Sequence, residues 1–303
     1  MLSVAVNTYL AVRRAAGFQL KPIELYLRSF ARFAAARGET HVVAQTAIDW
    51  ATTAASEAQR HNRLMTVRRF VYFIHAEDPR HELPPAGVFC GQRQRPIPYI
   101  FSAEEIHPLV TAARRLGPPG SLRPSTYSTL FGLLAATGMR PSEARALQLG
   151  DLTMDGLIIR QTKFKKSRLL PLHATTWGAL ESYLNRRRQV AGHVPHLFVS
   201  RRGGPLSYSV MVDTFYDVLK AAGIPRQASK PRPRLIDLRH TFAVRGLATC
   251  PDSRDQIGHH MLALTTYMGH AKVESTYWYL ESTPELMADI AQRCEAFVYG
   301  GEL

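Results

Sequence analysis

The chain has 303 residues and carries 38 Lys and Arg against 24 Asp and Glu, which gives a formal net charge of +14 and a pI near 10.0. An apolar fraction of 46% and a charged fraction of 20% exclude a disordered or fibrous protein. The length favours two domains. The positive charge predicts a polyanionic partner, either nucleic acid or an acidic membrane surface.

This positive charge is spread along the chain. Residues 1–98 carry 13 basic and 7 acidic side chains, a net +6, and the remaining residues carry 25 and 17, a net +8. A cationic tail would concentrate the excess at one end. We therefore expect both domains to meet the polyanion.

Cysteines and apolar segments bear on the compartment. Cys90, Cys250 and Cys294 are widely spaced and odd in number, which fits neither a disulfide framework nor a metal site. The apolar run at the start precedes its arginines, unlike a signal peptide, and no stretch approaches the ~20 apolar residues of a membrane span. We expect a cytoplasmic protein without membrane insertion.

In the first hundred residues, apolar side chains recur at three- and four-residue spacing, which predicts helices over 22–37, 41–55 and 60–76. A stretch rich in Pro and Gly follows, "ELPPAGVFCGQRQRPIPY". Ser102 and Glu105 then form a capping-box pattern that opens a new helix. We expect a helical domain over residues 1–85, a linker over 86–98, and a second domain over 99–303.

The second domain contains one β signal. Residues 156–172, "GLIIRQTKFKKSRLLPL", hold two apolar runs around a polar tip and predict a hairpin. Further helices are expected over 174–190, 208–222, 237–248 and 284–298. The fold class is therefore mainly α with a small antiparallel β-hairpin or sheet.

Four basic motifs lie in this second domain: "GMRPSEARAL" with Arg140, "TKFKKS" with Lys163, "DLRHTFAVR" with Arg239, and "MGH" with His270. Taken singly, each has an ordinary structural explanation, because an Arg or a Lys-rich turn usually faces solvent and a helical His usually packs. Nine residues after His270 stands Tyr279.

Together, in this order, the motifs resemble those of the tyrosine recombinases, the phage-integrase family of site-specific DNA recombinases. The resemblance spans almost the whole chain and implies a helical core-binding domain followed by a catalytic domain. It assigns the two catalytic arginines to Arg140 and Arg239 and the catalytic lysine to Lys163. It assigns the catalytic histidine to His270 and the nucleophile to Tyr279. Glu143 takes the place of an acidic companion to the first arginine.

The chemistry of strand transfer explains these residue types. Charge builds on the non-bridging phosphate oxygens in the transition state, and the guanidinium groups of Arg140 and Arg239 can grip those oxygens, with His270 as a further donor. Lys163, on a hairpin, can protonate the leaving 5' oxygen. The resemblance implies a covalent 3'-phosphotyrosine, a Holliday junction, and no metal ion or ATP.

One position departs from the family pattern, which usually has a histidine three residues before the second arginine, where this chain has Ile236. We expect His240 to face elsewhere, because neighbouring helical residues are about 100° apart; it is at most a supporting residue. Activation would then rest on the two arginines and His270, with slower cleavage. This hypothesis predicts faster cleavage after Ile236→His, and an unchanged rate would count against it.

The partners implied are double-stranded DNA with a specific site and further copies of the chain in a synaptic tetramer, with a nucleoid-associated location. The basic residues expected to contact DNA are Arg68, Arg69, Arg93, Arg95, Lys165, Lys166 and Arg168. The apolar stripe of helix 284–298 would pack on its own domain or dock on a neighbouring protomer. The closing segment favours a mobile element.

Two other functions remain open at this stage. One is DNA relaxation like that of a type IB topoisomerase, and the other is a DNA-binding relative that has lost catalysis, for which Ile236 is the supporting feature. The last motif also holds a second tyrosine, Tyr277. Residues two apart on a helix point about 200° from each other, so Tyr277 and Tyr279 should differ in environment. We expect Tyr277 and Trp278 to be packing residues that position Tyr279.

Overall fold

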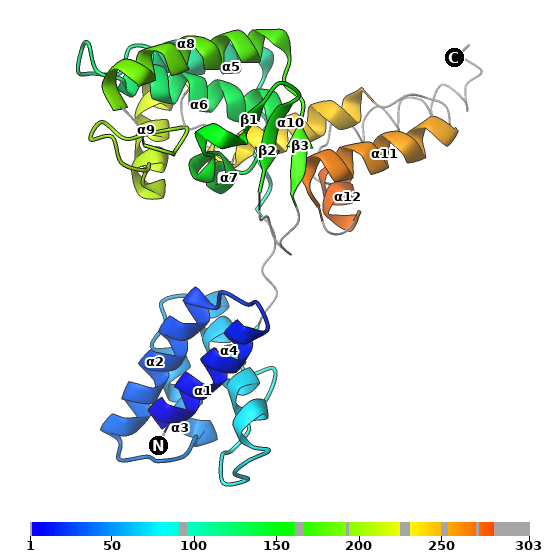
Figure 1. Ribbon diagram of the computed structural model, residues 1–303. Coiled ribbons are helices and arrows are strands. Elements are labelled where there is room, and N and C mark those ends of the chain that lie inside the picture. Colours follow the sequence, from blue (N-terminus) through cyan, green and yellow to red (C-terminus); the bar gives the residue numbers. More distant parts are fainter. Residues whose placement is uncertain are drawn as a thin grey trace. The chain divides into compact units, whose positions relative to one another are not determined.

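The computed structural model describes residues 2–90, 96–160, 167–191, 194–224, 231–249, 254–270 and 273–281. The chain divides into two compact units, Met1–Arg95 and Pro96–Leu303 (Figure 1). Among the described residues, the search for a helix long and apolar enough to cross a membrane finds none.

The first unit is a small helical domain. Its helices are α1 (Leu2–Ala15), α2 (Lys21–Ala36), α3 (Ala44–Thr52) and α4 (Glu57–Ile74). The three helices predicted from apolar spacing correspond to α2, α3 and α4, and the apolar run at the start of the chain adds α1. Its core is aromatic: Phe30 and Trp50 lie edge to face at 5.5 Å, and Tyr9 packs on Phe70 in the same way at 5.6 Å.

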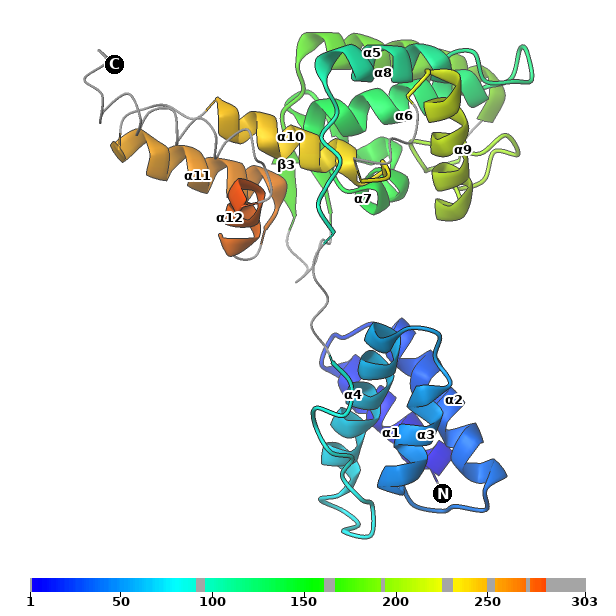
Figure 2. The same cartoon turned by 180° about the vertical axis from the view of Figure 1, so that it is seen from behind.

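The second unit begins with a helical bundle. Its helices are α5 (Ala103–Ala113), α6 (Arg123–Thr137), α7 (Pro141–Ala146), α8 (Ala174–Ala191) and α9 (Tyr208–Ala221). Within this unit, α5 and α8 both pack beside α6 (Figure 2). Helix α9 packs on α5, and its Phe215 lies in edge contact with Phe131 of α6 at 5.5 Å. The Glu105 carboxylate accepts the backbone N–H of Ser102 at 2.9 Å, as its half of the predicted capping box requires.

A three-stranded antiparallel sheet follows α7 and a 3-10 turn (Leu149–Asp151). Its strands are β1 (Leu152–Thr153), β2 (Gly156–Ile159) and β3 (Arg168–Leu170), in the order β1-β2-β3, with Leu157 opposite Leu170. The pairing of β2 with β3 confirms the predicted hairpin, and β1 extends it to a sheet. The hairpin tip, residues 161–166, lies outside the described residues.

The remaining described helices are α10 (Asp237–Ala248), α11 (Arg254–Met268) and α12 (Glu274–Glu281). In both views α11 and α12 lie on the other side of the sheet from α8 and α9 (Figures 1 and 2). A separate apolar cluster joins α10, α11 and α12, with Leu247, Met268 and Tyr279 among its buried members. The helix predicted over 284–298 lies outside the described residues.

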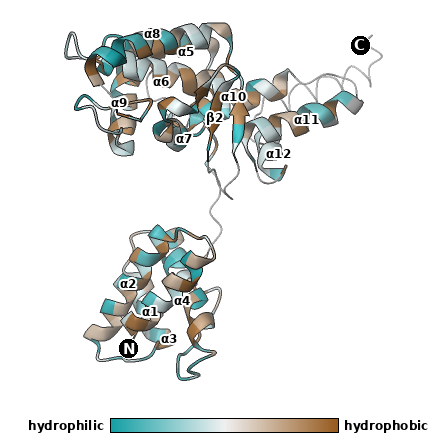
Figure 3. Cartoon of the chain, in the orientation of Figure 1, coloured by the Kyte–Doolittle hydropathy of each residue, from teal (hydrophilic) through white to brown (hydrophobic). Residues whose placement is uncertain are grey.

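Hydrophilic and hydrophobic residues are interleaved along the helices of both units, as amphipathic helices require (Figure 3). The fold class predicted from the sequence, mainly α with a small antiparallel sheet, is confirmed.

Candidate active site

Arg140 is positioned by the turn between α6 and α7. Helix α6 ends at Gly138, whose φ of +59° is left-handed and whose Cβ, if one were present, would lie 2.5 Å from the Phe242 ring. Glycine is therefore required there. The chain re-enters a helix at Pro141, with Arg140 as the N-cap residue and its backbone N–H donating to the Glu143 carboxylate at 2.9 Å.

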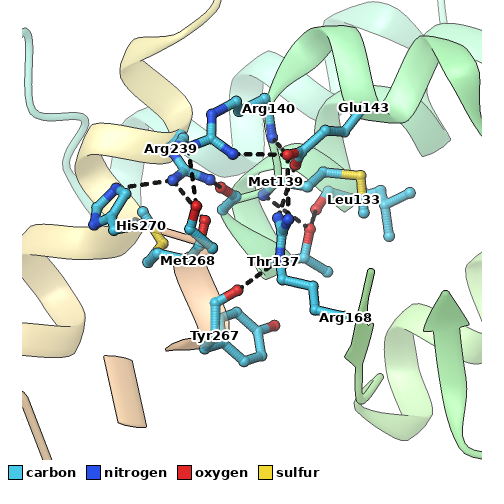
Figure 4. Close-up of polar contacts among 12 residues, drawn as sticks. Leu133, Thr137, Met139, Arg140, Glu143, Arg168, Arg239, Tyr267, Met268 and His270 are labelled. Carbon is cyan, nitrogen blue, oxygen red and sulfur yellow. Dashed lines mark hydrogen bonds and ion pairs between the residues drawn. The ribbon is translucent and has the colours of Figure 1, made fainter. Parts of the chain in front are cut away.

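Glu143 is the acid at the centre of a three-residue ion network (Figure 4). Arg140 donates from Nη1 at 2.7 Å, and Arg168 donates from Nη2 and Nη1 at 2.8 and 3.2 Å. Burial alone would raise the pKa of the Glu143 carboxyl, but the hydrogen bonds and charges of Arg168 and Arg140 outweigh burial and lower the pKa to about 2. The carboxylate is therefore ionised at neutral pH.

Arg168 binds β3 to the end of α11. Besides Glu143, it donates from Nε to the Tyr267 carbonyl at 2.9 Å, and its side chain is 10% exposed. The sequence led us to expect Arg168 among the DNA contacts. The structure instead directs its guanidinium inward, onto the base of the site, and leaves little of it for a phosphate.

Arg239 lies in the first turn of α10 and is 3% exposed. It donates to the carbonyls of Gly138 at 2.8 Å and Met268 at 2.8 Å, and its Nη2 lies 3.0 Å from Nε2 of His270. Arg140 reaches the same segment, donating to the Gly269 carbonyl at 3.3 Å. Burial and the charge of Arg140 lower the pKa of Arg239 to about 10, which still leaves the guanidinium charged at neutral pH.

His270 is held as a neutral imidazole. Burial lowers the pKa of His270 to about 4, and the positive charges of Arg239 and Arg140 act in the same direction. Nε2 accepts from Arg239, so Nδ1 carries the proton and donates to the Thr276 hydroxyl at 2.8 Å. Thr276 in turn lies 2.9 Å from the hydroxyl of Thr265. Neither threonine could be selected from the sequence alone.

Tyr279 lies on α12 and is 3% exposed, whereas Tyr277 is 49% exposed. The two tyrosines differ in environment as predicted, but Tyr277 is not a packing residue. Trp278 is, because its ring contacts Tyr279 at 5.2 Å and His240 at 5.4 Å. Tyr279 also stacks on His270, with ring centroids 6.1 Å apart and planes within 20°.

The expectation that His240 faces elsewhere is wrong. Its Nδ1 lies 3.2 Å from the hydroxyl of Tyr279. The expectation rested on the different directions in which the side chains of Arg239 and His240 leave the helix, and the two side chains do point in different directions. Helix α12, however, packs against the face of α10 that carries His240.

The structure thus brings together Arg140, Arg239, His270 and Tyr279, with Glu143 and His240 as direct neighbours. In the first unit, Arg69 is exposed on α4, and Arg68 donates to the Pro84 carbonyl and to Tyr72 at 2.9 Å. The other predicted residues lie outside the described ranges: Lys163, Arg93, Arg95, Lys165 and Lys166.

Comparison with known proteins decides the family. The model of the family described as "Phage integrase family" matches residues 100–285, more than half of the chain. The chain belongs to the phage integrase family. It is thereby a tyrosine recombinase, an enzyme of the DNA strand-transferase class, as the sequence motifs predicted.

Individual relatives agree. The recombinase is 38% identical to the integrase/recombinase y4rB of Sinorhizobium fredii, over 96% of each chain. It is 30% identical to the tyrosine recombinase XerD of Rhizobium meliloti, over 79% of this chain and 74% of that one. Among solved structures, a lambda integrase tetramer bound to a Holliday junction matches its fold with a TM-score of 0.62 at 17% identity, over 89% of this chain and 77% of that one.

A first prediction concerns the acid that anchors the recombinase site. We expect Glu143→Gln to lower the free energy of unfolding by roughly 3 kcal/mol, because the buried Arg168 loses the charge that compensates it. Urea unfolding, compared with Glu181→Gln on the exposed surface of α8, measures the effect. A variant as stable as the wild type would show that the network contributes no stability.

A second prediction concerns pH. His270 has a pKa of about 4 when folded and near 6.5 when unfolded, so the unfolded chain takes up a proton that the native site excludes. Its stabilising contribution is complete above pH 6.5 and is lost as the pH falls toward 4. The stability difference between the wild type and His270→Gln should therefore shrink between pH 7 and pH 5. A constant difference across this window would contradict a neutral His270; Glu143 titrates below it.

Proposed function

We propose that this recombinase cleaves and rejoins DNA at a specific site through a 3'-phosphotyrosine on Tyr279 and exchanges strands through a Holliday junction. One observation carries the proposal: two arginines and a histidine from separate segments converge beside one buried tyrosine. Recombinase chemistry needs such fixed donors at the phosphate and a nucleophile next to them.

The net positive charge of this cluster supports a phosphate-binding site there. The described side chains of the network are three guanidinium groups, Arg140, Arg168 and Arg239, and one carboxylate, Glu143. His270 adds no charge, so the network carries an excess of two positive charges. A phosphodiester would offset half of this excess. Arg140, whose side chain is 32% exposed, is the arginine best placed to receive the phosphate from solvent.

An anion bound at this site would change the protonation of His270. Burial is the main cause of the low pKa of His270, and the charges of Arg239 and Arg140 add to it. A phosphate beside these two arginines would offset their charges and so raise that pKa. The imidazole could then donate to a phosphate oxygen from Nε2, while Nδ1 keeps its hydrogen bond to Thr276. We propose that His270 becomes a donor only when DNA is bound.

We assign the general acid to Lys163, on the tip between β2 and β3. The hydrogen bonds of β3 support this assignment. Arg168, five residues after Lys163, donates from β3 to the Glu143 carboxylate and to the Tyr267 carbonyl. The base of the hairpin is thus fixed at the cluster, and we propose that Lys163 protonates the 5' oxygen that leaves the phosphate.

The remaining roles follow from charge and from the relatives. We propose that residues 1–85 form a DNA-binding domain, 86–98 a linker and 99–303 the catalytic domain, with contacts to the phosphate backbone that weaken steeply with salt. Arg69, exposed on α4, is a candidate contact.

Because lambda integrase is seen as a tetramer on a Holliday junction, we propose the same assembly here. The integrase/recombinase name of y4rB supports service to a mobile element.

The third prediction tests the nucleophile. The preferred site is first selected from a random duplex library by binding, and is then built into a nicked suicide substrate. We expect a covalent protein-DNA adduct on a denaturing gel, abolished by Tyr279→Phe and retained in Tyr277→Phe, whose exposed ring is the matched control. An adduct that survives Tyr279→Phe, or a selected site that the wild type binds and never cleaves, would overturn the proposal.

A plasmid carrying the selected site separates recombination from simple relaxation. Recombination requires two sites and yields exchanged products. Relaxation of a plasmid with one site or none, without exchanged products, would instead indicate the activity of a type IB topoisomerase.

A further inference from the structure

A polar path leads away from the nucleophile of the proposed reaction. The hydroxyl oxygen of Tyr279 lies 3.2 Å from Nδ1 of His240. On the other side of the ring, Nε2 of His240 lies 3.9 Å from Oδ1 of Asp237. The three groups form a sequence of phenol, imidazole and carboxylate, with the imidazole in the middle.

Helix geometry explains how His240 reaches this place. Ile236 precedes α10 with helical backbone angles, φ −68° and ψ −20°, so the helical spacing extends back to it. Residues four apart on a helix are rotated by only about 40°. His240 therefore lies one turn further along the same face as Ile236, the position at which the family pattern carries a histidine.

The Asp237 carboxylate favours one tautomer of His240. With the ring proton on Nε2, that proton faces Oδ1 of Asp237 at 3.9 Å, and the unprotonated Nδ1 can accept from the Tyr279 hydroxyl. Asp237 is fully buried, and Arg234 binds both of its carboxylate oxygens, at 2.7 Å for Oδ1 and 3.1 Å for Oδ2. Burial raises the pKa of Asp237, against the opposing effect of Arg234.

The other imidazole beside Tyr279, that of His270, is not placed to accept the phenolic proton. His270 stacks on the Tyr279 ring, but its Nε2 accepts from Arg239 and its Nδ1 donates to Thr276. Both of its nitrogens are therefore engaged in the described structure. His240 is the imidazole that points a basic nitrogen at the reacting oxygen.

We propose that His240 is the proton acceptor for Tyr279, acting in place of a histidine at position 236; this rests on the proposed function. In cleavage, the O–H bond of Tyr279 breaks and its proton passes to Nδ1 of His240. The phenolic oxygen forms a bond to phosphorus, the bond from phosphorus to the 5' oxygen breaks, and that oxygen keeps the electron pair and takes a proton from Lys163. The imidazolium formed is stabilised by Asp237. In ligation the steps reverse, and His240 returns the proton to the tyrosine oxygen.

The fourth prediction uses His240→Asn. The Asn side-chain oxygen can stand near the place of Nδ1 and accept a hydrogen bond, but it cannot take the proton. We expect DNA binding and stability to remain near wild type and the single-turnover cleavage rate to fall by about 100-fold to 10,000-fold, the usual contribution of a general base. His259→Asn, on the exposed face of α11, is the control and should cleave like the wild type.

The pH profile separates a lost proton acceptor from a merely disturbed helix. The titratable or charged groups known to face His240 are Asp237 on its own helix, Tyr279 on α12, and His270 at the end of α11 with its partner Arg239. With His240 as acceptor, the wild-type rate reaches a plateau, whereas the His240→Asn rate keeps rising with pH as hydroxide takes over. A uniform reduction with an unchanged profile would assign His240 a structural role and overturn the proposal.

Two further measurements isolate the step. A substrate with sulfur in place of the bridging 5' oxygen has a leaving group that needs no acid, so it should rescue Lys163→Ala and leave His240→Asn slow. Rescue of His240→Asn would place its action at the leaving group instead.

Ile236→His should give no increase in rate, contrary to the expectation drawn from the sequence, because His240 already accepts the proton. A large increase would contradict this inference. If the wild type forms no adduct, the proposed function fails; if it does and His240→Asn is equally fast, only this inference fails.

Discussion

The ion network centred on Glu143 determines the geometry of the site. One buried carboxylate, held ionised by Arg140 and Arg168, connects the start of α7 to β3. Arg168 then connects β3 to the end of α11 through the Tyr267 carbonyl. Segments from three parts of the sequence are fixed to one another in this way. The exposed part of Arg140 is therefore presented in a set position rather than as a mobile surface charge.

The second arginine depends on backbone carbonyls instead of an acid. Arg239 donates to the carbonyls of Gly138 and Met268, which lie at the ends of α6 and α11, where helical carbonyls have no partner within the helix. Those two helix termini carry partial negative charge, which favours a guanidinium there. These named hydrogen-bond partners of Arg239 are neutral, so they leave its positive charge unpaired.

The neutral state of His270 follows from the same arrangement. Its pKa is lowered by burial and by the arginines beside it, so the free site avoids a further positive charge. We propose that a bound phosphate offsets the arginine part of this effect, so that substrate binding favours protonation of His270. We further propose that a separate histidine, His240, accepts the proton of Tyr279.

The helices α2, α3, α4, α8, α9 and α10 and the hairpin could be predicted from the sequence, because apolar spacing is a local signal. The meeting of Arg140, Arg239, His270 and Tyr279 was implied by the resemblance of the motifs to those of the family. The inward turn of Arg168 could not be predicted, since it depends on a long-range ion pair with Glu143.

The errors at Tyr277 and His240 have another cause. His240 lies in a helix that was predicted over 237–248, and Tyr277 lies in a segment that was treated as helical without being predicted as a helix. In both cases, the face that the helix buries depends on which neighbour packs against it. For His240 a signal did exist, because counting one helical turn from Ile236 selects it. Thr276 and Thr265, which hold His270, carry no sequence signal without the fold.

The most direct test of the central claim is a structure of the recombinase on its selected site, nicked, with orthovanadate in place of the scissile phosphate. We predict that Arg140, Arg239 and His270 all donate to the equatorial oxygens of the vanadate, with the Tyr279 oxygen at one apex and Glu143 still bridging Arg140 and Arg168. Vanadate bound away from Arg239 and His270, or a Tyr279 oxygen that cannot approach the metal centre in line with the leaving oxygen, would contradict it.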